Sequence, residues 1–436
     1  MEKIAEFEEF RSRAEDLLSE VLESAWKSVV DGERIREADE LFREEMGKFA
    51  RELLGMALSR RGSKGTYGEE VICRCGDRAK FKQHRRHQVG TVLPGKTVDV
   101  EAAYYVCETC REGVTPLLAE LGTDGDVATV GLQELTVLAG VVAPYEEASS
   151  MLSKFAGLSV SGTRIQTRSV EEGEAVRERR RSIETEVCGD AVCVAIDGGM
   201  IHVDNRWQEV KLGVIYGEDS RVEVSSNRRT LISRDVVAVR GGPEDLSAVI
   251  ESRFSCDLGR LDVVVLGDGA KWIWNLAEDL FPSRIEILDY YHAAEHLSLC
   301  ALTLFGEDSS ETERWVEEQK ERLLDDKVEV VKEALKWLRQ RYRTGPRRKA
   351  IDDLSGYLEN NAHRMLYKTF IEAGHPIGSG PVESAVKHVV QCRMKRPGTH
   401  WRARGADAML PLRCLYRSSG QWDLHWNHKK APIKAA

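Results

Sequence analysis

The start of the chain has the hydrophobic spacing of two amphipathic helices. Apolar residues recur every three or four positions, with charges between them, over residues 4–26 and again over 41–54. The glycine-containing stretch RRGSKGTYG at 60–68 then separates these helices from the next segment of the chain. We interpret residues 1–62 as a helical N-terminal region with a docking or dimerisation role.

The next pattern is the two-residue alternation that is typical of strands. It covers residues 80–92 and 97–105, with a Pro94-Gly95 turn between them. Two cysteine pairs bracket this hairpin, and four thiolates in such a layout can surround one tetrahedral zinc ion. The first pair is tighter than the usual CxxC, so four unrelated thiols are the alternative. We expect a zinc-ribbon-like module over 69–115, with Zn²⁺ held by Cys73, Cys75, Cys107 and Cys110.

Helical spacing returns after residue 116. Within it, Leu152, a Gly157 turn and Ile165 have the spacing of a helix-turn-helix, and Ser161 is a suitable N-cap for the second helix. Residues 116–186 therefore indicate a helical, helix-turn-helix-like region. It either contacts DNA or is a small packing unit.

A change of composition near residue 190 begins an α/β region. The stretches that predict strands are 192–196, 207–217, 221–232, 263–266 and 284–289. The first three form a meander and the last two alternate with helices, which is the succession of a mixed, ribonuclease H-like (RNase H-like) sheet. We assign it to residues 187–299 and 373–436, with an all-helical insertion at 300–372. The predicted fold class is thus α/β and multidomain.

Three carboxylates in this region are candidates for a metal site. Asp197 and Asp268 each follow the C-terminal end of an apolar strand, where α/β sheets place their ligands. Glu383 lies in the first turn of a predicted helix after a glycine-rich turn. Such a trio can hold two Mg²⁺ (or Mn²⁺) ions about 4 Å apart, which suits an in-line phosphoryl displacement. Taken singly, either aspartate could be a turn residue.

Charge is distributed unevenly along the chain. The net charge is −9, yet residues 384–436 hold 11 Lys and Arg against two acids, whereas residues 1–50 hold eight against 15. A basic C-terminal region favours phosphate binding. For the basic residues of the hairpin, the alternative is a solvated face. For Trp401, it is a position in the protein core. The candidate DNA contacts are Lys387, Arg393, Lys395, Arg396, Trp401, Arg402 and Arg404, with Lys82, Arg85 and Arg86 on the hairpin.

Nothing in the sequence predicts a membrane span, because no run of 18 apolar residues occurs. The first residues are acidic and amphipathic, unlike the basic-then-apolar order of an export signal. Ten cysteines without such a signal indicate a reducing compartment. We expect a cytoplasmic protein.

Four segments resemble the DDE transposases of prokaryotic insertion sequences, ISKra-type elements above all and Mutator-like enzymes more distantly. The segments are IDGGMIHV (196–203), LGDGAKWIWN (266–275), LDYYHAAEHL (288–297) and GSGPVESAVKHVVQCRMKRPGTHW (378–401). The resemblance implies that Asp197, Asp268 and Glu383 form the DDE triad. It also implies that Asp289 and His292 support the reaction. For His292, the alternative is a helix-capping or core role.

The resemblance also implies an activity and its partners. The enzyme would hydrolyse phosphodiester bonds at the ends of its element and join the freed 3′-hydroxyl to target DNA. Its partners would be double-stranded terminal inverted repeats, target DNA and further copies of itself, in a dimer or larger, on the nucleoid. Two alternatives stay open: an RNase H-like nuclease or resolvase without strand transfer, and a non-catalytic zinc-ribbon DNA-binding regulator.

Overall fold

The computed structural model describes residues 2–30, 35–123, 127–180, 191–225, 228–254, 258 and 261–431. The protein is α/β, with a mixed sheet and many helices, as the sequence predicts. It divides into two compact units, Met1–Ser169 with Asp423–Ala436, and Val170–Trp422. Among the described residues, no helix combines the length and apolar character that crossing a membrane requires.

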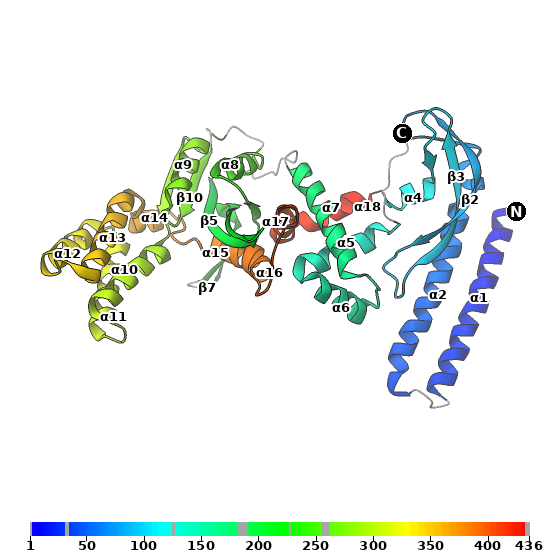
Figure 1. The fold of residues 1–436 in the computed structure, drawn as a ribbon, viewed down its shortest axis with the longest axis horizontal. Coiled ribbons are helices and arrows are strands. Elements are labelled where there is room, and N and C mark those ends of the chain that lie inside the picture. Colours follow the sequence, from blue (N-terminus) through cyan, green and yellow to red (C-terminus); the bar gives the residue numbers. More distant parts are fainter. Residues whose placement is uncertain are drawn as a thin grey trace. The chain divides into compact units, whose positions relative to one another are not determined.

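The first unit begins with the predicted helical pair, α1 (Glu2–Val29) and α2 (Ala38–Arg61), joined through the short 3₁₀ helix η1 (Ile35–Glu37) (Figure 1). The two helices pack against each other, and Leu17 and Val21 of α1 are buried. A short helix, α3 (Lys64–Tyr67), follows.

A four-stranded antiparallel sheet confirms the predicted hairpin. Its strands lie in the order β1-β2-β3-β4, and α2 packs against β3. The central pair runs in register from Ala79 opposite Cys107 to Val89 opposite Val98, with one bulge. The strands are β1 (Glu70–Ile72), β2 (Arg78–Val89), β3 (Val98–Cys107) and β4 (Gly113–Val114).

The predicted helix-turn-helix spacing is also present. Helix α6 (Tyr145–Ala156) ends at Gly157, which has a positive φ of 67°. Helix α7 (Gly162–Arg180) begins after Ser161, whose Oγ accepts a hydrogen bond from the Arg164 N–H at 3.2 Å. The predicted helical region extends to residue 186, but residues 181–186 lie outside the described residues. Residues 162–169 of α7 belong to the first unit and residues 170–180 to the second. The first unit's other helices are α4 (Pro116–Glu120), α5 (Val130–Val142) and the part of α18 (Gln421–Lys430) that follows residue 422.

The second unit contains a five-stranded mixed sheet in the order β11-β10-β5-β6-β9. Strand β6 is antiparallel to both of its neighbours, while β10 is parallel to β5 and β11. The strands are β5 (Ala191–Val203), β6 (Arg206–Gly217), β9 (Asp235–Val239), β10 (Asp262–Gly267) and β11 (Arg284–Leu288).

The third strand of the meander differs from the prediction. The stretch 221–232 forms a separate two-stranded ribbon, β7 (Arg221–Ser225) and β8 (Arg228–Leu231), after a short 3₁₀ helix, η2 (Glu218–Ser220). The strand that joins the sheet is β9, which was not predicted from the sequence. Its five residues, DVVAV, form a short apolar run that carries no distinguishing period.

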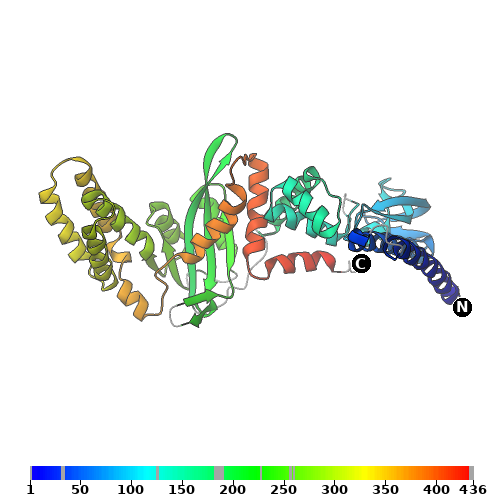
Figure 2. The ribbon, with the colours of Figure 1, turned by 90° about the horizontal axis from the view of Figure 1, so that it is seen from below.

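Helices cover both faces of this sheet (Figure 2). A Cβ added to Gly213 of β6 would meet Ile250 of α8 (Pro243–Glu251), and α9 (Lys271–Leu280) packs beside α8. On the other face, a Cβ added to Gly199 of β5 would meet Val386 and Val390. These two valines belong to a continuous helical segment made of α15 (Gly380–Ala385), a π-helical turn η5 (Val386–Gln391) and α16 (Cys392–Met394). Helix α17 (Ala403–Arg417) contacts η5 and β9.

The stretch predicted as a helical insertion is helical. Helix α10 contacts both α11 and α13, and the helices enclose buried leucines such as Leu323, Leu335 and Leu358. These helices are α10 (Tyr290–Phe305), α11 (Ser310–Leu324), α12 (Val328–Arg341), α13 (Gly345–Asn361), the 3₁₀ helix η4 (Ala362–Arg364) and α14 (Tyr367–Glu372).

Candidate functional site

The two candidate aspartates lie at the same level on adjacent parallel strands. Strands β5 and β10 pair through Ala195 and Leu266, and Asp197 and Asp268 each stand two residues farther along. The expectation that β5 ends before Asp197 is wrong, because β5 continues to Val203 alongside β6. Only its pairing with β10 stops short of Asp197, so both carboxylates still lie where β10 ends.

Glu383 lies on helix α15, which covers the sheet face that carries Asp197. Helix α15 packs on β5 and β6. Gly199 faces the following turn, η5, and Asp197 shares that face because alternate residues of a strand do. Glu383 is exposed, and its Oε1 accepts a hydrogen bond from the Ser379 hydroxyl at 3.1 Å.

All three predicted carboxylates line one pocket of about 300 Å³, together with His292 and Ser379. A second pocket of about 380 Å³ shares the two aspartates. Its other charged lining residues are Glu209 and Lys395. The structure therefore brings together residues that lie far apart in the sequence.

The carboxylates influence one another electrostatically. Burial, together with the negative charges of Asp268 and Glu383, raises the pKa of Asp197 to about 6. The Gly198 N–H, which donates to Asp197 Oδ1 at 2.6 Å, opposes this rise. A divalent cation would relieve the repulsion, and carboxylate oxygens are the ligands that Mg²⁺ prefers. The donor set therefore fits Mg²⁺.

Asp289 caps a helix beside the pocket. It is fully buried at the start of α10, and its Oδ1 accepts from the His292 N–H at 2.8 Å. Its Oδ2 accepts from the Ser379 N–H. Because backbone groups occupy both oxygens, Asp289 positions His292 and the turn that carries Glu383. The His292 side chain is 38% exposed and lines the pocket itself.

Several residues at the pocket were not predicted from the sequence, among them Glu295, which adds a fourth carboxylate to its lining. The Tyr357 hydroxyl, on α13 of the helical insertion, donates to the Asp268 carbonyl oxygen at 3.3 Å. Ser379 links Asp289 to Glu383 through its N–H and its hydroxyl. The spacing Ser379-x-x-x-Glu383 was visible in the sequence, but the partner Asp289 was not.

The four predicted zinc ligands form a compact cluster in the first unit. Cys73 and Cys75 lie between β1 and β2, and Cys107 and Cys110 flank the turn between β3 and β4. Their sulfur atoms all lie within 4.8 Å of one another, so the cluster can hold a metal ion such as zinc. The short Cys73-Arg74-Cys75 spacing does not prevent convergence. The Cys110 N–H, followed by that of Thr109, lowers the pKa of the Cys107 thiol to about 7.

The two candidate metal sites differ in compactness. Among the described residues, only the four cysteines bring three or more possible ligand atoms within 4.8 Å of one another. The carboxylates share a pocket at wider spacing. Two ions about 4 Å apart divide their ligands between them, so such a site does not need every carboxylate to approach every other.

The profile of one protein family spans nearly the whole chain, matching residues 29–430. The chain belongs to the uncharacterised protein family UPF0236. The match includes all four cysteines and all three carboxylates. A comparison with curated proteins finds no match.

Most of the predicted basic residues near Glu383 of this UPF0236 chain lie on the surface. Lys387, Lys395 and Arg402 are exposed, and Arg396 is half-buried. Arg404 is also exposed, but its guanidinium forms a bidentate ion pair with Glu174 at 2.7 and 2.9 Å. The exposed lysines are the best placed to meet a phosphate.

Arg393 and Trp401, which were predicted to contact DNA, do not lie on the surface. Both are buried, with exposed fractions of 3% and 7%, and the guanidinium lies 5.2 Å from the ring centroid. The Trp401 indole N–H donates to the Met394 carbonyl at 3.0 Å. These residues pack the interior, so neither reaches a DNA phosphate or base from this position.

The candidates on the hairpin of the UPF0236 chain remain on its surface. Lys82, Arg85 and Arg86 of β2 are all exposed. The Arg85 guanidinium lies 3.4 Å from the centroid of the Tyr104 ring on β3. This cation–π contact holds Arg85 flat against the sheet. Lys82 and Arg86 are the freer of the three to follow a DNA backbone.

Proposed function

We propose that this UPF0236 chain is a DDE transposase of a prokaryotic insertion sequence. The observation that carries the proposal is the pocket shared by Asp197, Asp268, Glu383 and His292. Three carboxylates from two adjacent strands and a helix can hold the two ions of a phosphoryl transfer. A pocket open to solvent also leaves room for a nucleic acid strand.

The sheet topology supports an RNase H-like core. The antiparallel meander β5-β6-β9 is followed by β10 and β11, which are added in parallel on the other side of β5. Asp197 lies on the first strand, just past its pairing with β10, Asp268 follows the fourth strand, and Glu383 follows the helical insertion.

The proposed chemistry is two successive phosphodiester displacements. Water first attacks the phosphorus at an element end, and the P–O bond to the 3′ oxygen breaks, which frees a 3′-hydroxyl. That hydroxyl then attacks a phosphodiester of target DNA, and the displaced oxygen leaves with a proton. Bound Mg²⁺ ions would supply activation of the attacking oxygen and stabilisation of the leaving oxygen.

The chain's own residues have distinct tasks in this scheme. Asp197, Asp268 and Glu383 would hold the cations, and the Ser379 hydroxyl, which donates to Glu383, orients that carboxylate. Lys395 lines the adjoining pocket and would neutralise a phosphate of the bound strand. No serine or tyrosine nucleophile is needed, because no covalent protein intermediate forms.

The first unit supplies the proposed grip on DNA. A zinc-ribbon-like module with Zn²⁺ on the four cysteines would present Lys82 and Arg86, and α7 would act as the second helix of a helix-turn-helix. We propose that they bind the terminal inverted repeats, with further copies of the chain holding the second end. The protein would act in the cytoplasm, on the nucleoid.

The test is Mg²⁺-dependent cleavage and strand transfer on the DNA that flanks the coding region. Asp268→Ala and Glu383→Ala should each reduce cleavage by at least about 100-fold while DNA binding persists. Asp279→Ala, which removes an exposed acid of α9, is the matched control and should retain activity.

The same assay separates the rival functions. Cleavage without joined products would favour a nuclease or resolvase. Binding of the repeats without any cleavage by the wild type would favour a DNA-binding regulator. Equal cleavage by the wild type and both triad variants would remove these carboxylates from the chemistry.

A further inference from the structure

The edge strand of the five-stranded sheet has an outer side that is only partly covered. Strand β9 pairs with β6 on its inner side. On its outer side, the Val236 N–H donates to the Ser418 Oγ at 2.9 Å. Arg234 exchanges two hydrogen bonds with Ser419, at 3.0 and 3.2 Å. The chain itself therefore uses the first part of this edge as a pairing surface.

The second part of the edge has unused backbone groups. Since backbone groups of an antiparallel strand point alternately to either side, the N–H and C=O of Ala238 face outward like those of Val236. Within the described part of the chain, no residue forms a hydrogen bond with this outward pair. An open pair of this kind is a template for an added strand.

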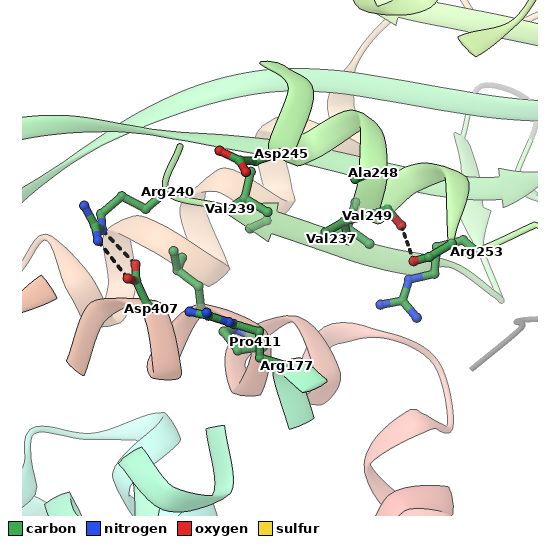
Figure 3. Close-up of a pocket in the computed structure, with 13 residues that line it drawn as sticks. Arg177, Val237, Val239, Arg240, Asp245, Ala248, Val249, Arg253, Asp407 and Pro411 are labelled. Atoms are coloured by element: carbon green, nitrogen blue, oxygen red, sulfur yellow. Dashed lines mark hydrogen bonds and ion pairs between the residues drawn. The ribbon is translucent and has the colours of Figure 1, made fainter. Parts of the chain in front are cut away.

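A pocket of about 630 Å³ lies along this part of the edge, between α8 and α17 (Figure 3). Val237, Ala238 and Val239 contribute from β9. Each helical wall has apolar residues beside one acid: Ala248 and Val249 accompany Asp245 on α8, and Leu410 and Pro411 accompany Asp407 on α17. The volume lies within the range of ligand-binding pockets. We call this pocket the edge groove.

Apart from Arg177, the charged residues around the edge groove have partners within the protein. Asp245 of α8 lines the groove, and its Oδ2 accepts a hydrogen bond from the Gly242 N–H at 3.0 Å. Arg240 forms a bidentate ion pair with Asp407, both contacts measuring 2.7 Å, as the dashed lines in Figure 3 mark. Arg253 is buried and lies 3.2 Å from Asp235.

Arg177 differs from the other two arginines of the groove. It is exposed, it lines the groove beside Pro411, and no hydrogen bond or ion pair engages it within the described residues. Its guanidinium is therefore available to an incoming carboxylate.

We propose that the edge groove binds a short extended peptide of a partner protein, which adds to β9 as a further strand. Backbone hydrogen bonds to Ala238 supply the pairing. Alternate side chains of the peptide contact the apolar walls on either side, and one carboxylate meets Arg177. The preferred peptide thus has small apolar residues around a glutamate or aspartate. This mode of binding takes its affinity from the backbone and its specificity from the pockets for side chains.

The probe is fluorescein-labelled acetyl-Gly-Ser-Val-Glu-Val-Ser-Gly-amide, with anisotropy measured against the full-length protein. Two modified probes accompany it, one methylated on the backbone nitrogens of both valines and one with lysine in place of glutamate. Each modification should weaken binding about tenfold or more, because each removes hydrogen bonds or a charge pair.

Protein variants give the reciprocal test. Ala238→Pro removes the outward N–H at an edge position that tolerates proline, and Arg177→Glu reverses the available charge. Both should weaken binding of the parent probe about tenfold or more. Arg343→Glu, an exposed arginine of the helical region, should bind as the wild type does. Circular dichroism melts establish that each variant is folded.

Three outcomes would overturn the proposal. The first is the absence of saturable binding of the parent probe by folded wild-type protein at about 1 mM. The second is wild-type binding that backbone methylation leaves unchanged, a result that does not depend on any variant folding. The third is an Ala238→Pro protein that changes its oligomeric state but not its affinity for the probe, which would assign the edge to a second copy of the chain.

Discussion

The cysteine cluster and the carboxylate pocket are the two candidate metal sites, and they bring their side chains together in different ways. Two turns of one small sheet supply all four sulfur atoms, which lie within 4.8 Å of one another. The carboxylates come from β5, β10 and α15, and they line an open pocket. Closed tetrahedral thiolate sites stabilise a fold, whereas open sites leave positions for a substrate. Under the proposed function, the first site contributes stability and the second contributes chemistry.

The largest expected effect is on the cysteine side of the comparison. Cys107→Ser should remove bound zinc and unfold the sheet of residues 70–114, since structural zinc contributes on the order of 10 kcal/mol to small domains. Zinc content by mass spectrometry and proteolysis within 70–114 are the measurements. Cys392→Ser, an exposed cysteine elsewhere, is the matched control. A Cys107→Ser protein as resistant to proteolysis as the wild type would contradict a structural role.

In contrast to the cysteine cluster, the carboxylate pocket should destabilise the fold when no cation is added, because its negative charges repel one another. Burial raises the pKa of Asp197 from 3.8 to about 6, so the folded state retains a proton that the unfolded state has lost. The unfolding free energy should therefore fall as pH rises from about 4 through 6, by about 3 kcal/mol at most. Below pH 4 this contribution is fully present.

Denaturant titrations of zinc-loaded protein across this pH range provide the measurement. Asp197→Asn should flatten the profile, and saturating Mg²⁺ should restore stability to the wild type at pH 7. A profile that Asp197→Asn leaves unchanged would place the titration elsewhere in the molecule.

A smaller effect should separate positioning from metal binding. Ser379→Ala removes the hydroxyl that donates to Glu383 but leaves the Ser379 backbone N–H on Asp289. Cleavage should fall about tenfold, as is usual when a group that orients a metal ligand is lost, with little change in melting temperature. Ser379→Thr should recover most of the activity. Equal losses in both variants would indicate a packing effect instead.

The smallest expected effect is that of removing one basic residue, either beside the carboxylate pocket or on the hairpin. Lys395→Ala and Arg86→Ala should each lower the salt dependence of DNA binding by about one phosphate contact. Only Lys395→Ala should also slow cleavage of saturated complexes, because Lys395 lines the pocket of the aspartates. Identical cleavage rates for the two variants would remove that distinction.

The sequence predicts best where a local pattern determines the structure. The β2–β3 hairpin follows from alternation around Pro94-Gly95, and the N-cap role of Ser161 follows from residue type and position. The level of Asp268 follows from a continuous apolar strand that ends at Gly267. Even the four cysteines converge as their spacing predicts, because both pairs lie in turns of one antiparallel sheet.

Long-range pairing explains what the sequence could not predict. Glycines at 198 and 199 normally interrupt a strand, yet pairing with β6 carries β5 through them to Val203. Trp401 is buried because its backbone pairs with the end of β5, where its N–H donates to the His202 carbonyl. Arg393 is buried with it. No local pattern separates these two from the basic residues around them that stay exposed.

The most direct test of the central claim is a Mn²⁺ titration of the zinc-loaded protein, followed by electron paramagnetic resonance. Mn²⁺ prefers oxygen ligands, so the cysteine cluster does not interfere. We predict that the wild type and Asp279→Ala bind Mn²⁺ alike, and that Asp268→Ala and Glu383→Ala lose the binding. Unchanged Mn²⁺ binding in both triad variants would show that these carboxylates do not form a metal site.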